Sequence, residues 1–457
     1  MEASSTPTAP VGIFDAHHPP SRELVDDCVH CGFCLPACPT YLLWGQEMDS
    51  PRGRIYLTRM GLDGRASFTT SYLEHFDACL GCMACVTACP SGVQYGALIE
   101  AVRPQLERHA PRSWLDRLFR RSLFALFPYP SRLRLIAWPL WIYQCTGLQR
   151  LVRASGVLQL MPRRMRAMES LAPPLSFPGG TKDIPAENPA RGPSRLRVGL
   201  LLGCVQRVFF GEVNAATVRV LTAEGCDVIV PRNQQCCGAL MVHSGREREA
   251  LEAARALIDA FEGADVDVIV TNAAGCGSTL KEYGHLLRDD PRYAQKAAAL
   301  ASRARDISEV LAELSPQAPR HSLQLRVAYH DACHLQHGQG ISAQPRRVLQ
   351  SIPGLEVLEI SDGSLCCGSA GIYNLVEPEP AHALGARKAA NILATGADVV
   401  ASSNPGCLLQ IRTELAQTGK SLPMLHLVEL VDASIRGISI TMEHEVKRSG
   451  DISIKTS

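Results

Sequence analysis

Two closely spaced runs of cysteine constrain the fold of this chain more than any other feature. Residues 28–39 are CVHCGFCLPACP and residues 79–90 are CLGCMACVTACP, so both follow the pattern C-x2-C-x2-C-x3-C-P. In such a run three thiols on one short loop converge on one metal cluster, and the fourth thiol reaches across to the other cluster. The pattern predicts two [4Fe–4S] clusters, because structural zinc usually uses C-x2-C pairs with a longer spacer.

The crossed pattern predicts which cysteines hold each cluster. The ligands expected for the first cluster are Cys28, Cys31, Cys34 and Cys89. The ligands expected for the second cluster are Cys79, Cys82, Cys85 and Cys38. The apolar neighbours expected to keep water away are Phe33, Leu35, Leu80 and Met83.

A helix is expected to begin after the first run, with Ser50 as N-cap and Pro51 at its first position. Arg52 and Arg54 on this helix would influence a cluster potential if they faced a cluster. Two solvated arginines are the favoured interpretation.

Length and composition exclude several classes of protein. The 457 residues are enough for two or three domains, and a net charge of +1 gives no overall field that would attract nucleic acid. The 18 cysteines cluster in short motifs, which indicates metal sites in a reducing compartment, most simply the cytoplasm. The N-terminus predicts no secretory signal, and no apolar stretch of about 18 residues predicts a membrane span.

The N-terminal half divides into three segments. Residues 1–20 are rich in Pro and Ser and are expected to be disordered, and residues 21–111 are expected to form a helical ferredoxin-like domain. Residues 112–194 form a basic connector and linker, in which 112–166 contain eleven arginines, one acid and three tryptophans. The stretch 112–166 suits contact with an anionic membrane surface or a partner subunit, and equally a connector whose apolar face covers the cluster domain.

An internal repeat fills the C-terminal half. Four cysteines recur at offsets of 129, 130, 130 and 131 residues, which indicates a duplicated unit. The first repeat, residues 195–324, contains the first tetrad: Cys204, Cys236, Cys237 and Cys276. The second repeat, residues 325–436, contains the second tetrad: Cys333, Cys366, Cys367 and Cys407. Residues 437–457 form a polar tail.

Each repeat alternates apolar strand-like runs with helical runs, so the fold class is α+β with two duplicated α/β Cys-Cys-Gly domains after the ferredoxin-like domain. Four of the tetrad cysteines end strand-like runs, which predicts that each tetrad gathers at the carboxyl edge of a parallel sheet.

The chemistry of the tetrads stays open at the level of sequence. They are candidates for one or two additional iron–sulfur clusters, for a structural metal or redox-thiol site, or for simple packing of buried cysteines. Cys145 and Cys226 are expected to be buried and inert. The histidines near the tetrads are favoured as hydrogen-bonded residues at helix ends rather than ligands: His243, His330, His334 and His337.

The motifs, with DSPRGRIYL at 49–57, LQHGQ at 335–339 and LCCGSAGIYNL at 365–375, resemble the iron–sulfur subunits of bacterial glycolate oxidases over Cys28 to Val428. The resemblance implies a flavoprotein partner that oxidises glycolate to glyoxylate, and electron transfer from it to a quinone or other membrane acceptor. No nucleotide-binding fingerprint or catalytic residues are found in this chain, so substrate oxidation is expected on the partner. We expect a cytoplasmic location, and peripheral contact with the inner face of the cytoplasmic membrane through 112–166 is one of the two alternatives for that segment.

Related subunits of anaerobic glycerol-3-phosphate or lactate dehydrogenases, and a stand-alone electron-transfer protein, remain alternatives. The wider Cys-Cys-Gly family includes heterodisulfide reductases, whose domain closes with C-x2-C. Thr279 and Gln410 stand where that second cysteine would be, which argues against thiol–disulfide chemistry. The connector is expected to be the least family-specific part of the chain.

Overall fold

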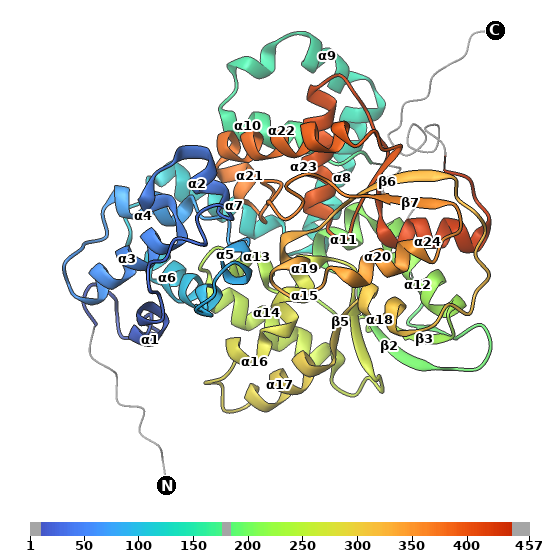
Figure 1. Cartoon of the computed structure of the whole chain (residues 1–457), viewed down its shortest axis with the longest axis horizontal. Helices are drawn as coiled ribbons and strands as arrows, with labels where there is room; N and C mark the ends of the chain where they lie inside the picture. Colours follow the sequence, from blue (N-terminus) through green and yellow to red (C-terminus); the bar gives the residue numbers. More distant parts are fainter. Residues whose placement is uncertain (1–10, 176–183, 441–457) are drawn as a thin grey trace.

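The N-terminal part of the chain is helical and lies at one side of the molecule, in blue in Figure 1. The computed structural model describes residues 11–175 and 184–440. Its first helices are α1 (Arg22–Asp26), α2 (Pro39–Trp44), η1 (Glu47–Asp49), α3 (Pro51–Leu62), α4 (Thr70–Asp77), α5 (Ala84–Thr87) and α6 (Tyr95–His109). Helix α3 begins as predicted, because the Ser50 hydroxyl accepts a hydrogen bond from the Gly53 amide at 3.0 Å.

A small apolar core holds these helices together. Phe14, Ile55, Phe76, Leu98 and Val102 are each at most 3% exposed and belong to one cluster. Full burial of each such side chain contributes roughly 1.5–3 kcal/mol. Phe14 lies in the N-terminal segment that was expected to be disordered, so residues 11–20 pack against the domain. Residues 1–10 lie outside the described residues.

A helical connector follows the ferredoxin-like domain. Its elements are α7 (Trp114–Leu126), α8 (Pro130–Cys145), α9 (Leu148–Ala154), η2 (Val157–Leu160) and α10 (Arg163–Ser170). Leu123 and Phe124 of α7 are buried in one cluster with Cys204 and Leu375, which come from the two repeats. Arg112 pairs with Asp77 of α4, its Nη1 lying 2.6 Å from Oδ2. The connector therefore packs against all three domains.

The first repeat contains a five-stranded sheet in the order β1-β3-β2-β4-β5. Its strands are β1 (Glu187–Asn188), β2 (Leu196–Leu201), β3 (Cys226–Ile229), β4 (Val268–Thr271) and β5 (Ala304–Asp306). All neighbours are parallel except β1, which comes from the expected linker and pairs antiparallel with β3. The helices are α11 (Cys204–Phe209), α12 (Gly211–Ala223), α13 (Ala239–Val242), α14 (Glu247–Phe261), α15 (Ala274–Lys281), α16 (Tyr283–Leu286), α17 (Ala294–Arg303) and α18 (Ile307–Glu313).

The second repeat contains a four-stranded parallel sheet in the order β7-β6-β8-β9. Its strands are β6 (Leu325–His330), β7 (Leu355–Leu358), β8 (Val399–Ser402) and β9 (Met424–His426). Its helices are α19 (Cys333–Gln336), α20 (Ala343–Gln350), α21 (Tyr373–Val376), α22 (Pro378–Ala394), α23 (Pro405–Gln417) and α24 (Leu427–Arg436). The order and direction of these strands match those of β3, β2, β4 and β5.

The two repeats share one hydrophobic core. Val198 of β2, Val327 of β6 and Leu427 of α24 are fully buried in the same cluster. Between the two repeats, Arg219 of α12 also donates a hydrogen bond to Asp432 of α24, with Nη2 2.7 Å from Oδ2. The repeats are therefore packed as one unit, which fixes the position of one tetrad relative to the other.

Candidate metal centres

The first set of ferredoxin-type cysteines surrounds one cavity near the surface. All four lie on its wall: Cys28, Cys31, Cys34 and Cys89. Cys31 is exposed and the other three are half-buried. Phe33, which was expected to exclude water, is instead 66% exposed, and Val29 in the same loop is 68% exposed. This centre therefore lies where a partner protein can approach it.

The second set is buried. Its members, Cys38, Cys79, Cys82 and Cys85, are each at most 8% exposed. Cys38 caps α2 and Cys85 lies in α5. Burial raises the pKa of Cys85, and the nearby thiols of Cys79 and Cys38 raise it further. Four thiols that would repel one another as thiolates need a cation between them, which suits a metal cluster.

Arg54 lies beside this second set. It is 1% exposed, and its guanidinium donates to the carbonyls of His75 at 2.6 Å and Asp49 at 2.7 Å. Burial alone would raise the pKa of Cys79, but Arg54 and Arg103 outweigh it and hold that pKa below its usual value. The expectation of a solvated arginine is wrong for Arg54.

The first tetrad forms a chain of thiols at the carboxyl edge of its sheet. Cys204 Sγ lies 3.5 Å from Cys236 Sγ, and the nearby thiol of Cys276, together with burial, raises the pKa of Cys237. Cys204 and Cys276 lie in the first turns of α11 and α15, a few residues beyond the strand ends that the sequence suggested.

The second tetrad has the same arrangement. Cys333 Sγ lies 3.9 Å from Cys366 Sγ, and the nearby thiol of Cys407, together with burial, raises the pKa of Cys367. Gly368, after the Cys-Cys pair, has φ +90°, and a Cβ there would lie 2.4 Å from the carbonyl oxygen of Ala381. Only glycine fits this turn without strain. In both repeats the thiol of the strand-end cysteine lies in contact with the first cysteine of the Cys-Cys pair.

Four histidines were expected to be hydrogen-bonded residues at helix ends. In three of them at least one ring nitrogen has no hydrogen-bond partner among the described residues. His330 has no partner at either ring nitrogen, and His243 and His334 have none at Nε2, among the described residues. The rings of His243 and His334 stack with centroids 4.5 Å apart. His337 fits the hydrogen-bonded interpretation, since its ring nitrogens contact Thr87 and Ser364.

Lys388 is a functional candidate that sequence reasoning missed. Its side chain is buried, and its Nζ donates to the carbonyls of Asp362 at 2.6 Å and Gly363 at 3.2 Å, just before the second Cys-Cys pair. Burial lowers the pKa of Lys388, while the nearby thiols of Cys367 and Cys366 oppose that shift. The sequence signal is its position on the apolar stripe of α22.

The two cysteines outside these sets differ from each other. Cys226 is fully buried in β3, as expected. Cys145, at the end of α8, is exposed, so the expectation that it would be buried is wrong. Neither belongs to a group of converging thiols in the described part of the chain.

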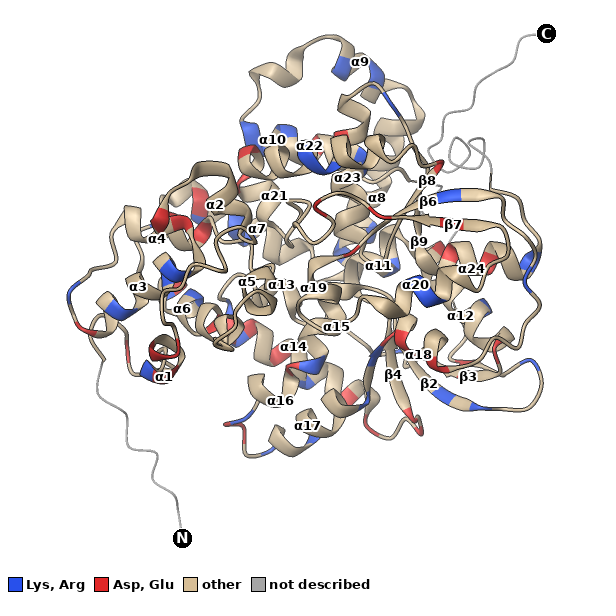
Figure 2. Cartoon of the chain, viewed as in Figure 1, with Lys and Arg blue, Asp and Glu red and all other residues tan. Residues whose placement is uncertain are grey.

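The connector has an exposed apolar surface. Fifteen large apolar side chains between residues 114 and 168 are exposed, including Leu135 at 74% and Leu160 at 87%. Blue segments of Lys and Arg mark α9 and α10 in Figure 2. None of the helices in the described ranges is sufficiently long and apolar to span a membrane.

Comparisons with known proteins match segments of the N-terminal domain, the connector and both repeats. Residues 24–93 match the 4Fe-4S dicluster domain, and residues 198–281 and 327–412 each match the cysteine-rich domain. Residues 115–172 match the linker region of the glycolate oxidase iron-sulfur subunit. The chain is 41% identical over 89% of its length to the probable glycolate oxidase iron-sulfur subunit of Bacillus subtilis, covering 93% of that protein. The chain belongs to the family of glycolate oxidase iron–sulfur subunits.

Other relatives agree with this family. The glycolate oxidase iron-sulfur subunit of Escherichia coli is 35% identical over 89% of the chain and 93% of its own length. Lactate utilization protein A of Geobacillus kaustophilus is 32% identical over 52% of the chain and 99% of its own length. The predicted family and [4Fe–4S] cofactors are confirmed, but the connector is not the least family-specific part, since it has a family model of its own.

Proposed function

We propose that this chain is the electron-transfer subunit of a glycolate dehydrogenase complex. It receives electrons from a flavoprotein subunit that oxidises glycolate to glyoxylate, and it passes them toward a quinone in the membrane. The observation that carries the proposal is the continuous series of thiol sites, from exposed Cys31 through the buried second set to the second tetrad. Family membership supports the choice of complex.

The ligand assignment follows the crossed pattern. Cys28, Cys31, Cys34 and Cys89 hold one [4Fe–4S] cluster, and their shared cavity supports this. Cys79, Cys82, Cys85 and Cys38 hold the other, which their common burial supports. When bound, such clusters accept and release single electrons, at potentials set by nearby charge, hydrogen bonds and burial. The convergent tetrads hold further iron–sulfur clusters.

Two surfaces suit the two partners. Exposed Val29 and Phe33 beside Cys31 offer an apolar contact for the flavoprotein close to the first cluster. The exposed apolar side chains and arginines of α7 to α10 suit the anionic inner surface of the cytoplasmic membrane. On this view the chain is cytoplasmic and peripheral.

A lactate-oxidising complex is the second candidate. It is favoured by the similarity to lactate utilization protein A over 52% of the chain. The same arrangement of cysteines would serve either donor, because the substrate binds to the partner.

Reconstitution tests the proposed function. The purified chain alone should not reduce an artificial dye with glycolate, lactate or glycerol-3-phosphate, and co-purification with its flavoprotein should give glycolate-dependent reduction. The Cys145→Ser variant, altered at an exposed cysteine, should behave like the natural chain. Dye reduction by the single chain with glycolate would refute the proposal, and preference for lactate would favour the second candidate.

A further inference from the structure

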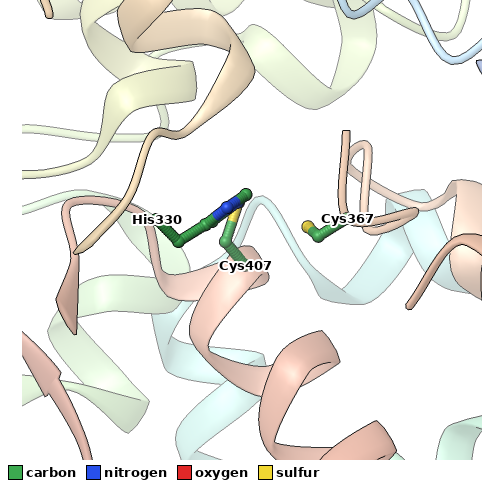
Figure 3. Close-up of side chains that lie close together, drawn as sticks. All are labelled: His330, Cys367 and Cys407. Atoms are coloured by element: carbon green, nitrogen blue, oxygen red, sulfur yellow. The ribbon is translucent and has the colours of Figure 1, made fainter. Parts of the chain in front are cut away.

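His330 is the last residue of β6 and faces the second tetrad. A ring nitrogen of His330 and the Sγ atoms of Cys367 and Cys407 all lie within 4.8 Å of one another, and all three residues are buried. In Figure 3 the sulfur of Cys407 lies beside the imidazole ring, and Cys367 points its sulfur toward both. One nitrogen and two sulfurs at this spacing can bind the same metal centre.

Packing alone does not account for this histidine. Its side chain is 1% exposed, and neither ring nitrogen has a hydrogen-bond partner among the described residues. A buried polar group without a partner costs roughly 1–3 kcal/mol. His337 shows the usual solution, since its Nδ1 lies 2.8 Å from Thr87 Oγ1 and its Nε2 lies 3.0 Å from the Ser364 carbonyl.

Gln410 stands at the position where related domains carry a fifth cysteine. Its side chain is hydrogen-bonded to other residues. The Gln410 amide oxygen accepts from Asn374 at 2.9 Å, and its nitrogen donates to the Ala381 carbonyl at 3.1 Å and to Glu414 at 3.2 Å. Gln410 therefore does not face the tetrad as a ligand, and His330 is the additional donor present there.

The first repeat lacks this feature. Leu201 ends β2 as His330 ends β6, and the two strands share the same register with their neighbours. Lys388 also has an apolar counterpart in the first repeat, Leu257. The carbonyls of Ala250 and Ala381 lie against the glycines that follow the two Cys-Cys pairs, so these alanines are equivalent. Leu257 and Lys388 stand at the same distance along the chain after them. A histidine and a lysine thus replace two leucines at the second site alone.

We propose that His330 is a nitrogen ligand of the metal centre at the second tetrad, together with Cys367 and Cys407. This inference shares one premise with the proposed function, namely that the second tetrad holds a metal. Compared with the fifth thiolate of related domains, a neutral imidazole carries one negative charge less, which raises the reduction potential. The ammonium of Lys388 acts in the same direction. Because the first site has Leu257 in the place of Lys388, we expect the second site to have the higher potential.

Pulsed EPR on the anaerobically purified full-length protein tests this ligand. Protein with ¹⁴N- and ¹⁵N-labelled histidine should show a nitrogen coupling of the strength of a directly bound imidazole. His330→Gln should abolish that coupling while both ferredoxin-type clusters remain. His330→Cys should retain the iron and lower the potential of this centre in a redox titration. His337→Gln is the matched control and should leave the coupling unchanged.

Two outcomes overturn the inference. One is a nitrogen coupling that persists in His330→Gln, and the other is the absence of any metal beyond the two ferredoxin-type clusters. If the second tetrad holds zinc, X-ray absorption at the zinc edge should show a nitrogen ligand that His330→Gln removes. That result would support the ligand while refuting an electron-transfer role for this site, so the two proposals fail separately.

Discussion

Cys82 of the second ferredoxin loop and Cys366 of the second Cys-Cys pair share one buried cluster, although they come from opposite halves of the chain. Leu80, Cys333 and Tyr373 belong to the same cluster. Burial raises the pKa of Cys82, and the neighbouring thiol of Cys333 raises it further. The second ferredoxin-type centre thus adjoins the second tetrad through packed side chains that exclude water.

The crossed ligand pattern predicts the effect of two single substitutions. Cys31→Ser should remove the first cluster and Cys82→Ser the second, because each cluster loses one of its four thiolates. Each variant should keep roughly half of the ferredoxin-type iron. Iron and sulfide analysis of anaerobically purified protein measures this, and an unchanged iron content in both variants would contradict the assignment.

The two variants should also differ in their EPR spectra, because Cys82 lies in one buried cluster with Cys366. Paramagnetic centres in adjoining sites broaden each other's EPR signals. The signal of the second tetrad should therefore sharpen in Cys82→Ser and stay broad in Cys31→Ser, where the adjoining centre remains. Equal line widths in the two variants would mean that the second cluster does not lie next to this tetrad.

Arg54 is expected to raise the potential of the second ferredoxin-type cluster. Its charge stabilises the more negative reduced form, and a unit charge about 8 Å away contributes roughly 2 kcal/mol at an effective dielectric constant of about 20. Arg54→Met should lower the potential by up to roughly 90 mV for one electron. A redox titration followed by EPR measures the shift.

Arg54→Lys is the control for this charge. It keeps the positive charge while it loses the guanidinium hydrogen bonds to His75 and Asp49. A shift in Arg54→Lys as large as that in Arg54→Met would assign the effect to altered hydrogen bonding rather than to charge.

Motif spacing predicted the local features of this protein well. The helix start at Ser50, and the contacts of Cys204 with Cys236 and of Cys333 with Cys366, follow from short-range rules about capping and strand edges. The burial of Arg54 did not follow, because Arg52 and Arg54 project from different sides of α3 and the sequence does not say which side is covered. The shared cluster of Cys82 and Cys366 did not follow either, since it depends on how the domains pack.

The last prediction concerns metal and stability at the tetrads. Cys367→Ser should lower both the iron content and the melting temperature, because metal binding contributes to folding and crowded thiolates without a cation repel one another. Cys226→Ser makes the same change of sulfur to oxygen at a fully buried site in β3. It should keep all its iron and cost roughly 1 kcal/mol. Equal iron contents and equal melting temperatures for the two variants would show that Cys367, like Cys226, is merely packed.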